Sequence, residues 1–195
     1  MTTQAERRAA TRTKIVSAAR SNFAMTGFED THTGDILASA GVSRGAMYHH
    51  FQSKRDVFEA VFITVSDETI ARSALDRSAG PSPLEDLIEA CLAWLRVARE
   101  PEVAAILLDE GPQVLGWKRA RDLEEQSSLG VMKRGLERAI EAGEIQVGSL
   151  DLTARLVNAL VAEIALSALH ADPAPRAQEQ ELALRAFLSG LRTPA

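Results

Sequence analysis

The sequence contains little that a disulfide, a metal centre or a membrane span would need. It has one cysteine, Cys91, in 195 residues, which excludes an intramolecular disulfide and indicates no cysteine-based metal site. Cys91 lies in an apolar stretch and is predicted to be an inert core residue. No run of 18 apolar residues occurs, and residues 150–171, the longest stretch rich in Ala and Leu, contain Asp151, Arg155 and Glu163. We therefore expect no membrane segment.

The patterns of secretion and catalysis are also missing. Residues 1–8 have no apolar signal core, so we expect a cytoplasmic protein. There is no Gly-rich phosphate loop and no Ser/His/Asp order typical of a hydrolase. His49 and His50 are neighbours that point about 100° apart on a helix, so they do not form a metal site. We expect no enzyme activity, no cofactor and no metal.

Charge is distributed unevenly along the chain. The formal net charge is −5, which argues weakly against nucleic acid. Residues 1–54, however, carry seven Lys/Arg and four Asp/Glu, a net charge of +3, whereas residues 55–195 carry fifteen and 23, a net charge of −8. Phosphate attraction is local, because salt screens it over about 10 Å. The N-terminal end is therefore a candidate to face DNA, although an excess of this size could arise by chance.

Apolar residues recur every three or four positions along almost the whole chain, and strand-like alternation is nearly absent. Gly80-Pro-Ser-Pro83 is the clearest break. The sequence predicts an all-α fold with one helical unit over residues 1–53 and a second over residues 54–195. The helix from 54 to about 77 connects the two. The nine expected helices cover about residues 15–27, 33–40, 44–50, 53–77, 84–99, 102–110, 116–142, 150–171 and 176–191.

Residues 35–51 have the pattern of two short helices joined by a tight turn. Gly41 sits where the first helix needs a left-handed closing residue, and Ser43 can cap the second. This is the layout of the helix-turn-helix, whose second helix enters the major groove of DNA. An ordinary helical hairpin has the same pattern, so the turn alone favours DNA binding only slightly. The residues expected to hold the two helices at their angle are Phe23, Ile36, Val42 and Phe51.

Several segments around the turn form a more specific combination. They are Thr31-His-Thr-Gly-Asp-Ile36, Ala40-Gly-Val-Ser-Arg-Gly45, Tyr48-His-His-Phe-Gln-Ser-Lys54, Val57-Phe58, and upstream Ile15-Val-x-x-Ala-x-x-x-Phe23-x-x-x-Gly27-Phe28. Together they resemble the N-terminal domain of TetR-family transcriptional regulators. The resemblance covers about residues 10–62 and implies binding to double-stranded DNA. It also implies that residues 1–53 are a helix-turn-helix DNA-binding domain and residues 54–195 a helical ligand-binding and dimerisation domain.

The third helix is the recognition helix by position. Arg44 carries a planar fork suited to guanine or to a phosphate, and Lys54 opens the fourth helix, where the helix dipole favours a phosphate. Gly34 departs from the family, in which a basic or bulky residue is common at that position, so base contact there is in doubt. The positions that match DNA contacts in the family are Thr33, Ser43, Arg44, Gly45, Ala46, Tyr48, His49 and Lys54.

The last two predicted helices are the candidates for dimerisation. The resemblance implies a bundle of two helices from each subunit, and a two-fold DNA site calls for two recognition helices. We therefore expect a homodimer on a pseudo-palindromic operator. Alternatively, these helices complete a monomeric core. The apolar residues of the last helix are Leu182, Leu184, Phe187, Leu188 and Leu191.

A ligand pocket of the family type would lie among the helices between residues 84 and 171. Core packing is the usual explanation for any one of its apolar candidates. Glu163 is more unusual, because it shares a helix face with Leu156 and Leu166, and a carboxylate there needs a partner. That partner is Arg155, an arginine across the dimer or a cationic ligand. The candidate lining residues are Trp94, Leu95, Leu107, Leu108, Leu115, Trp117, Met132 and Glu163.

These features predict a sequence-specific DNA-binding transcriptional regulator, a repressor released by a small apolar or amphipathic ligand. Two alternatives remain open. One is an activator, or a regulator without a ligand, that uses the same DNA-binding residues. The other is a ligand-binding or enzymatic helical protein that has lost DNA recognition.

Overall fold

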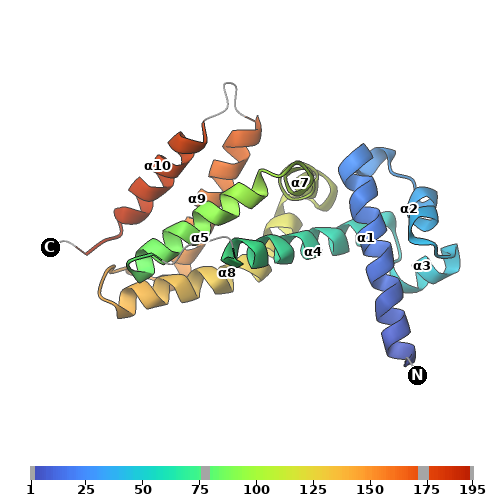
Figure 1. Cartoon of the computed structure of the whole chain (residues 1–195), viewed down its shortest axis with the longest axis horizontal. Coiled ribbons are helices and arrows are strands. Elements are labelled where there is room, and N and C mark those ends of the chain that lie inside the picture. The colour runs from blue at the N-terminus through green and yellow to red at the C-terminus, as the bar shows by residue number, and fades with distance from the viewer. Residues whose placement is uncertain (1–2, 76–79, 171–175, 194–195) are drawn as a thin grey trace.

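The computed structural model describes residues 3–75, 80–170 and 176–193, and it is elongated, with the N-terminal helices at one end (Figure 1). Within these ranges the regular structure is helical, apart from an isolated antiparallel bridge between Ile145 and Arg192. The helices are α1 (Gln4–Asp30), α2 (Thr33–Ala40), α3 (Arg44–His50), α4 (Lys54–Leu75), α5 (Pro83–Ala98), α6 (Pro101–Val103), the π-helix η1 (Ala104–Glu110), α7 (Gly111–Leu115), α8 (Trp117–Glu141), α9 (Leu150–His170) and α10 (Ala177–Ser189).

The all-α prediction is confirmed, and the described residues form nine helical segments when α6, η1 and α7 are counted as one bent segment. The stop predicted at Gly111-Pro112 is wrong, because the helical path continues to Leu115. Pro112 is tolerated because it lies in the first turn of α7, where a missing N–H costs little. The predicted ends at Arg77 and Ala171 lie outside the described residues.

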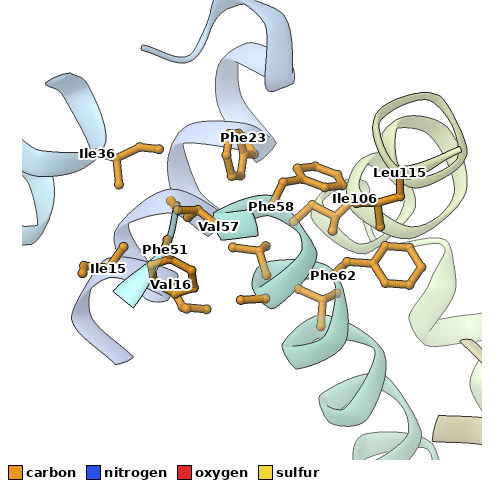
Figure 2. Packing of buried hydrophobic residues seen from close by; sticks show 14 of the residues in the cluster. Ile15, Val16, Phe23, Ile36, Phe51, Val57, Phe58, Phe62, Ile106 and Leu115 are labelled. Carbon is orange, nitrogen blue, oxygen red and sulfur yellow. The ribbon is translucent and has the colours of Figure 1, made fainter. Parts of the chain in front are cut away.

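A first hydrophobic cluster joins the N-terminal helices to the middle of the chain (Figure 2). The predicted packing residues Phe23, Ile36 and Phe51 are buried in it, and Val42 packs against it. Phe58 of α4 stacks edge-on against Phe23, with ring centroids 5.2 Å apart. The cluster also includes residues of η1, α7 and α8, among them Ile106, Leu115, Ala120 and Leu123. The helix-turn-helix is thus packed onto the segment that follows α5.

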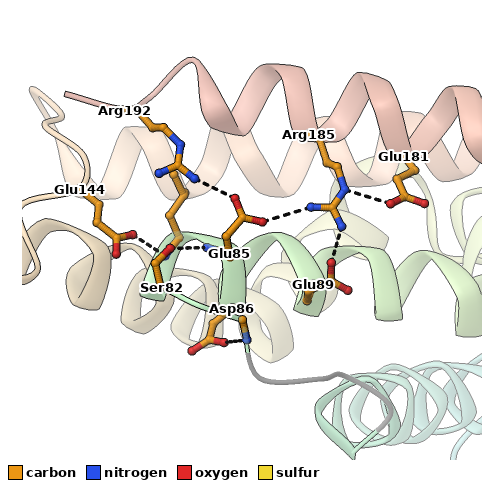
Figure 3. A network of polar contacts seen from close by, with 10 residues as sticks. Ser82, Glu85, Asp86, Glu89, Glu144, Glu181, Arg185 and Arg192 are labelled. Carbon is orange, nitrogen blue, oxygen red and sulfur yellow. Dashed lines mark hydrogen bonds and ion pairs between the residues drawn. The ribbon is translucent and has the colours of Figure 1, made fainter. Parts of the chain in front are cut away.

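A second hydrophobic cluster is formed by α5, α8, α9 and α10. Cys91 lies within it, and burial raises the pKa of its thiol to about 12, as expected of an inert core residue. Arg185 of α10 pairs with Glu85 and Glu89, which joins α10 to the first two turns of α5 (Figure 3). On the inner side of α10, Leu184 is fully buried in the same cluster.

α9 is rich in apolar residues, but much of its apolar surface is exposed in the described structure. Its segment Leu150–Leu169 is long and apolar enough to cross a membrane by length and composition alone, and 28% of its most apolar window is buried. A bilayer is not needed to account for it, because Asp151 and Arg155 form an ion pair on the helix and Arg155 also pairs with Glu125 of α8. The side chains of Leu152 and Leu156 are 56% and 61% exposed, so α9 presents an apolar face that the other described residues do not cover.

We expect Gly111→Ala to destabilise the fold by about 1–3 kcal/mol through overpacking. A Cβ at this position would lie 2.5 Å from the Phe62 ring and 3.0 Å from the carbonyl oxygen of Ile106. The matched control is Gly34→Ala on α2, where a Cβ would meet no atom within 4 Å. That control should be neutral or stabilising by up to about 1 kcal/mol in urea unfolding. Equal stability of the two variants would contradict the packing described for Gly111.

Candidate functional site

The turn between α2 and α3 has the predicted caps. Gly41 closes α2 in the left-handed region, with φ of 63°, and the Ser43 hydroxyl accepts a hydrogen bond from the N–H of Ala46 at 3.2 Å. Met47 on the inner side of α3 is fully buried and fixes the helix on the first cluster. The two helices are therefore held at their angle by local caps and by a shared core.

The outer side of α3 brings four predicted DNA-contact residues together: Arg44, Gly45, Tyr48 and His49 are all exposed. The guanidinium of Arg44 lies 5.6 Å from the centre of the Tyr48 ring, a cation–π distance that keeps the arginine close to the helix. A Cβ on Gly45 would meet no atom within 4 Å, so the backbone is accessible there. Ser43 is exposed, whereas Thr33 and Ala46 are partly exposed at the starts of α2 and α3.

The surroundings of α3 are positively charged. The pKa of His50 is lowered, first by burial and then by the positive charges of Arg8, His49 and Arg12. The Arg12 guanidinium lies 5.3 Å from the centre of the Phe51 ring, which holds this charge beside the end of α3. A duplex approaching α3 would meet these α1 side chains as well, since phosphate attraction acts over several ångströms.

Lys54 differs from the other predicted contacts, because its ammonium is already engaged. Its Nζ donates to the carbonyl oxygens of Phe28, Glu29 and Thr31, and lies 4.2 Å from the centre of the Phe28 ring. These carbonyls belong to residues 28–31, the turn that follows the kink at Gly27 and ends α1 at its C-cap Thr31, where a cation satisfies carbonyls that have no helical partner. The geometry therefore favours a structural role for Lys54 over a phosphate contact.

The N–H at the start of the same turn is bound by Glu110, the last residue of η1. Both carboxylate oxygens of Glu110 accept from the N–H of Phe28, at 2.7 and 2.9 Å. Burial raises the pKa of Glu110, and the bond from Phe28 opposes that shift. Gly27 precedes this contact with φ of 79°, and a Cβ there would lie 2.7 Å from the Glu110 carboxylate. Glu110 was not among the predicted site residues.

Two adjoining cavities lie between α4, α5, α8 and α9. The first has a volume of about 180 Å³ and also touches η1 and α7, and the second has a volume of about 300 Å³. Four residues line both: Ser66, Trp94, Glu124 and Asn158. Small-molecule sites have volumes of roughly 300–1,000 Å³, so the second cavity is at the lower end of that range and the first is below it.

Six of the eight predicted lining residues border these cavities. Trp94 lines both, Met132 lines the second, and Leu107, Leu108, Trp117 and Glu163 line the first. Trp117 nevertheless remains 60% exposed. Leu95 and Leu115 line neither cavity, because they are buried in the second and first clusters respectively.

Sequence reasoning missed Glu124, the carboxylate shared by both cavities. Burial raises its pKa to about 7, and the nearby charges of Arg121 and Glu125 have smaller effects. Within the described ranges, no hydrogen bond or ion pair holds its side chain. Its signal in the sequence is a spacing of four, since Ala120, Glu124 and Met132 fall on the same buried side of α8.

The structure removes one of the three predicted partners of Glu163. Arg155, one predicted partner, is instead paired with Asp151 and Glu125. Glu163 is exposed at the edge of the first cavity and makes no hydrogen bond or ion pair with another described residue. An arginine across a dimer and a cationic ligand remain open as its partner.

The chain matches known families over most of its length. Residues 15–61 match the family described as bacterial regulatory proteins, tetR family, and residues 84–191 match the tetracyclin repressor-like C-terminal domain. The transposon Tn10 TetC protein of Escherichia coli is 24% identical over 182 residues, which cover 91% of this chain and 90% of TetC.

Solved structures share the same arrangement of helices. A TetR-family transcriptional regulator from Pectobacterium atrosepticum aligns with a TM-score of 0.84 and 28% identity, covering 99% of both chains. RolR in complex with resorcinol aligns with a TM-score of 0.76 over 97% of this chain and 90% of RolR. Its 17% identity supports the fold alone.

The capped turn, the exposed α3 and the positive charges beside it define a helix-turn-helix DNA-binding protein. With both parts of the chain matched, it belongs to the TetR family of transcriptional regulators. This family is not enzymatic, as the sequence predicts.

We expect Arg44→Ala and Lys54→Ala to act on different properties. Arg44→Ala should cost about 1–3 kcal/mol of operator binding and relax preference at one operator position, with stability nearly unchanged. Lys54→Ala should cost about 1–3 kcal/mol of folding stability, because three carbonyls lose a charged donor. Salt-dependent DNA titrations and urea unfolding of both variants separate the two roles.

If Arg44→Ala leaves affinity and specificity as they were, the assignment of α3 as the recognition helix is wrong. A Lys54→Ala protein of normal stability, with a salt slope lower by about one, would restore the phosphate role expected from the sequence.

We expect Glu124→Gln to stabilise the protein above neutral pH. Because the folded-state pKa is raised from 4.5 to about 7, the folded chain binds this proton more tightly, and stability falls as pH rises through that window. The full cost is present above pH 7 and corresponds to at most about 3 kcal/mol. Removing the charge should therefore raise Tm by a few degrees at pH 8 and hardly at all at pH 4.5.

The control is Glu137→Gln, an exposed carboxylate on the same helix, for which we expect no such difference. A Glu124→Gln protein that is equally stabilised at both pH values, or destabilised at pH 8, would contradict the described burial.

Proposed function

We propose that the protein is a homodimeric repressor that binds a pseudo-palindromic operator through α3 and is released when a small apolar or amphipathic ligand enters the two cavities. The observation that carries this proposal is the position of Glu110. It follows Leu107 and Leu108, which line the first cavity, and it binds the last turn of α1 beside the helix-turn-helix.

A route for release runs through η1. A π-helix has a wider hydrogen-bond spacing than an α-helix, and short π segments often occur at functional sites. A ligand that displaces Leu107 or Leu108 moves the same short helix that ends at Glu110. The Phe28 contact then shifts, and α1 turns with the recognition helix. Release requires only that the ligand bind this second arrangement more tightly than the DNA-bound one, by a few kcal/mol.

The exposed apolar faces of α9 and α10 favour the dimer. Leu182 and Phe187 of α10 are 61% and 66% exposed, and Leu156 of α9 is 61% exposed. Leu184 and Leu188, which the sequence grouped with them, are buried in the second cluster and are already used within one chain. The remaining exposed residues have the composition of a subunit interface.

The proposed organisation assigns DNA binding to residues 1–53 and ligand binding and dimerisation to residues 54–195. The first hydrophobic cluster crosses that boundary, which supports mechanical coupling between the two units. A regulator of this kind works where the DNA is, so we place it in the cytoplasm.

We expect Phe187→Glu and Leu156→Glu to give folded monomers with weak operator binding. Both side chains lie on the exposed faces, so a charge should disrupt subunit contact without creating a core cavity. The operator is first selected from a library of DNA fragments by the unaltered protein and should contain an inverted repeat. Sedimentation then gives the oligomeric state of each variant at micromolar concentration, and a DNA titration gives its affinity.

The control is Leu184→Glu, which should unfold the protein because that side chain is fully buried. A wild-type protein that sediments as a monomer, or that selects no DNA fragment above background, would overturn the proposed function.

A further inference from the structure

We propose that the two cavities bind an amphipathic organic cation, with Glu124 facing the cationic group and the apolar part lying in the larger cavity. This inference rests on the proposed ligand-binding role of the cavities and deepens it by naming the class of ligand. The juxtaposition that carries it is an unpaired carboxylate between two largely apolar chambers, beside Trp94.

The charged groups around the first cavity are not balanced. Its lining contains one basic residue, Arg121, and three acidic residues, Glu124, Glu125 and Glu163. Arg121 is paired with Glu125 at 3.2 Å, and Glu125 is also paired with Arg155. Glu124 and Glu163 are left without an ion pair among the described residues. The lining thus has a formal charge of −2, with its unpaired groups on α8 and α9.

A carboxylate in such a place is costly unless something compensates it. Glu124 is only partly exposed, and it borders apolar groups in both cavities. Burial of a charge without a partner shifts the group toward its neutral form or requires an ion of opposite sign. A ligand with a positive charge supplies that ion, and the indole ring of Trp94 adds a favourable surface for it. An anionic ligand would be repelled by the same carboxylates.

The second cavity suits the apolar part of the same ligand. Its lining includes Ile70, Leu87, Val131, Met132 and Val161, and its volume of about 300 Å³ is the larger of the two. Asp86 in this lining also accepts a hydrogen bond from the N–H of Gly80.

Two further charges, those of Arg134 and Arg138, belong to the second cavity and lie on exposed residues of α8. They make the solvent side of that cavity less favourable for a cation, so the charged group is assigned to the Glu124 side. Glu163 faces the first cavity from α9, and α4 contributes no charged lining residue.

Binding of a cation should depend on pH with a defined sign. Burial raises the pKa of Glu124 to about 7, so below pH 7 the cation must displace a proton. Affinity should therefore fall about tenfold between pH 8 and pH 6. A neutral ligand that merely fills the cavities should show no such fall.

The test uses the full-length protein with two probes of the same shape, benzyltrimethylammonium and its uncharged isostere neopentylbenzene. Calorimetry at pH 8, together with Trp fluorescence, measures binding of each. We expect the cation to bind at least about tenfold more tightly than the isostere, and Glu124→Gln to bring the two within about threefold. Glu137→Gln, the matched control on α8, should keep the full preference. Glu163→Gln, at an exposed position, should lose part of it.

Equal binding of the two probes, an unchanged preference in Glu124→Gln, or no binding of the cation at millimolar concentration would overturn the inference. Thermal unfolding and operator binding confirm that each variant is folded. Operator release is measured separately with the same probes. A cation that binds through Glu124 without releasing DNA supports the subsite and contradicts the release mechanism. If the neutral probe releases DNA and the protein shows no preference for the cation, the release mechanism is supported and the cation subsite is contradicted.

Discussion

The last turn of α1 is the contact on which the arrangement of the molecule depends. Two side chains of opposite charge hold it, with Glu110 accepting from the N–H of Phe28 and Lys54 donating to three carbonyls of the same turn. The ring of Phe28 packs against Phe23 and Phe58, with centroids 5.7 and 5.4 Å apart. Because Lys54 starts α4 and Glu110 ends η1, this one turn sets the position of the helix-turn-helix relative to the helices that border the cavities.

The parts of the structure that local chemistry specifies were predictable from the sequence. Gly41 and Ser43 have the conformations expected of a helix end and a helix start, because both depend on nearest neighbours in the chain. The continuation of the helix through Gly111 was not predictable, since it depends on close packing against Phe62, about fifty residues away. The engagement of Lys54 was hidden for the same reason, because its acceptors lie on α1.

For the residues that line the two cavities, prediction from the sequence has a different limit. Aromatic and aliphatic candidates such as Trp94 and Leu107 could be found, because they are apolar at helical spacing. The helical spacing of Glu124 with Ala120 does not by itself distinguish it from a solvated residue of an acidic helix, since its burial is created by α4, α5 and α9 together. The raised pKa of Glu124 means that its charged form destabilises the folded protein. An apolar residue at this position would not have that cost, so a carboxylate here is typical of a functional site.

The uneven charge has a consequence for how the protein meets DNA. The +3 segment forms one end of an elongated molecule, and the remaining residues carry −8. This separation gives each chain a large electric dipole along its length. Near a duplex, the field of the phosphates exerts a torque that turns α1–α3 toward the DNA and the acidic body away before any atom touches. The orientational search is shortened as a result, and the gain disappears as salt shortens the range of the field.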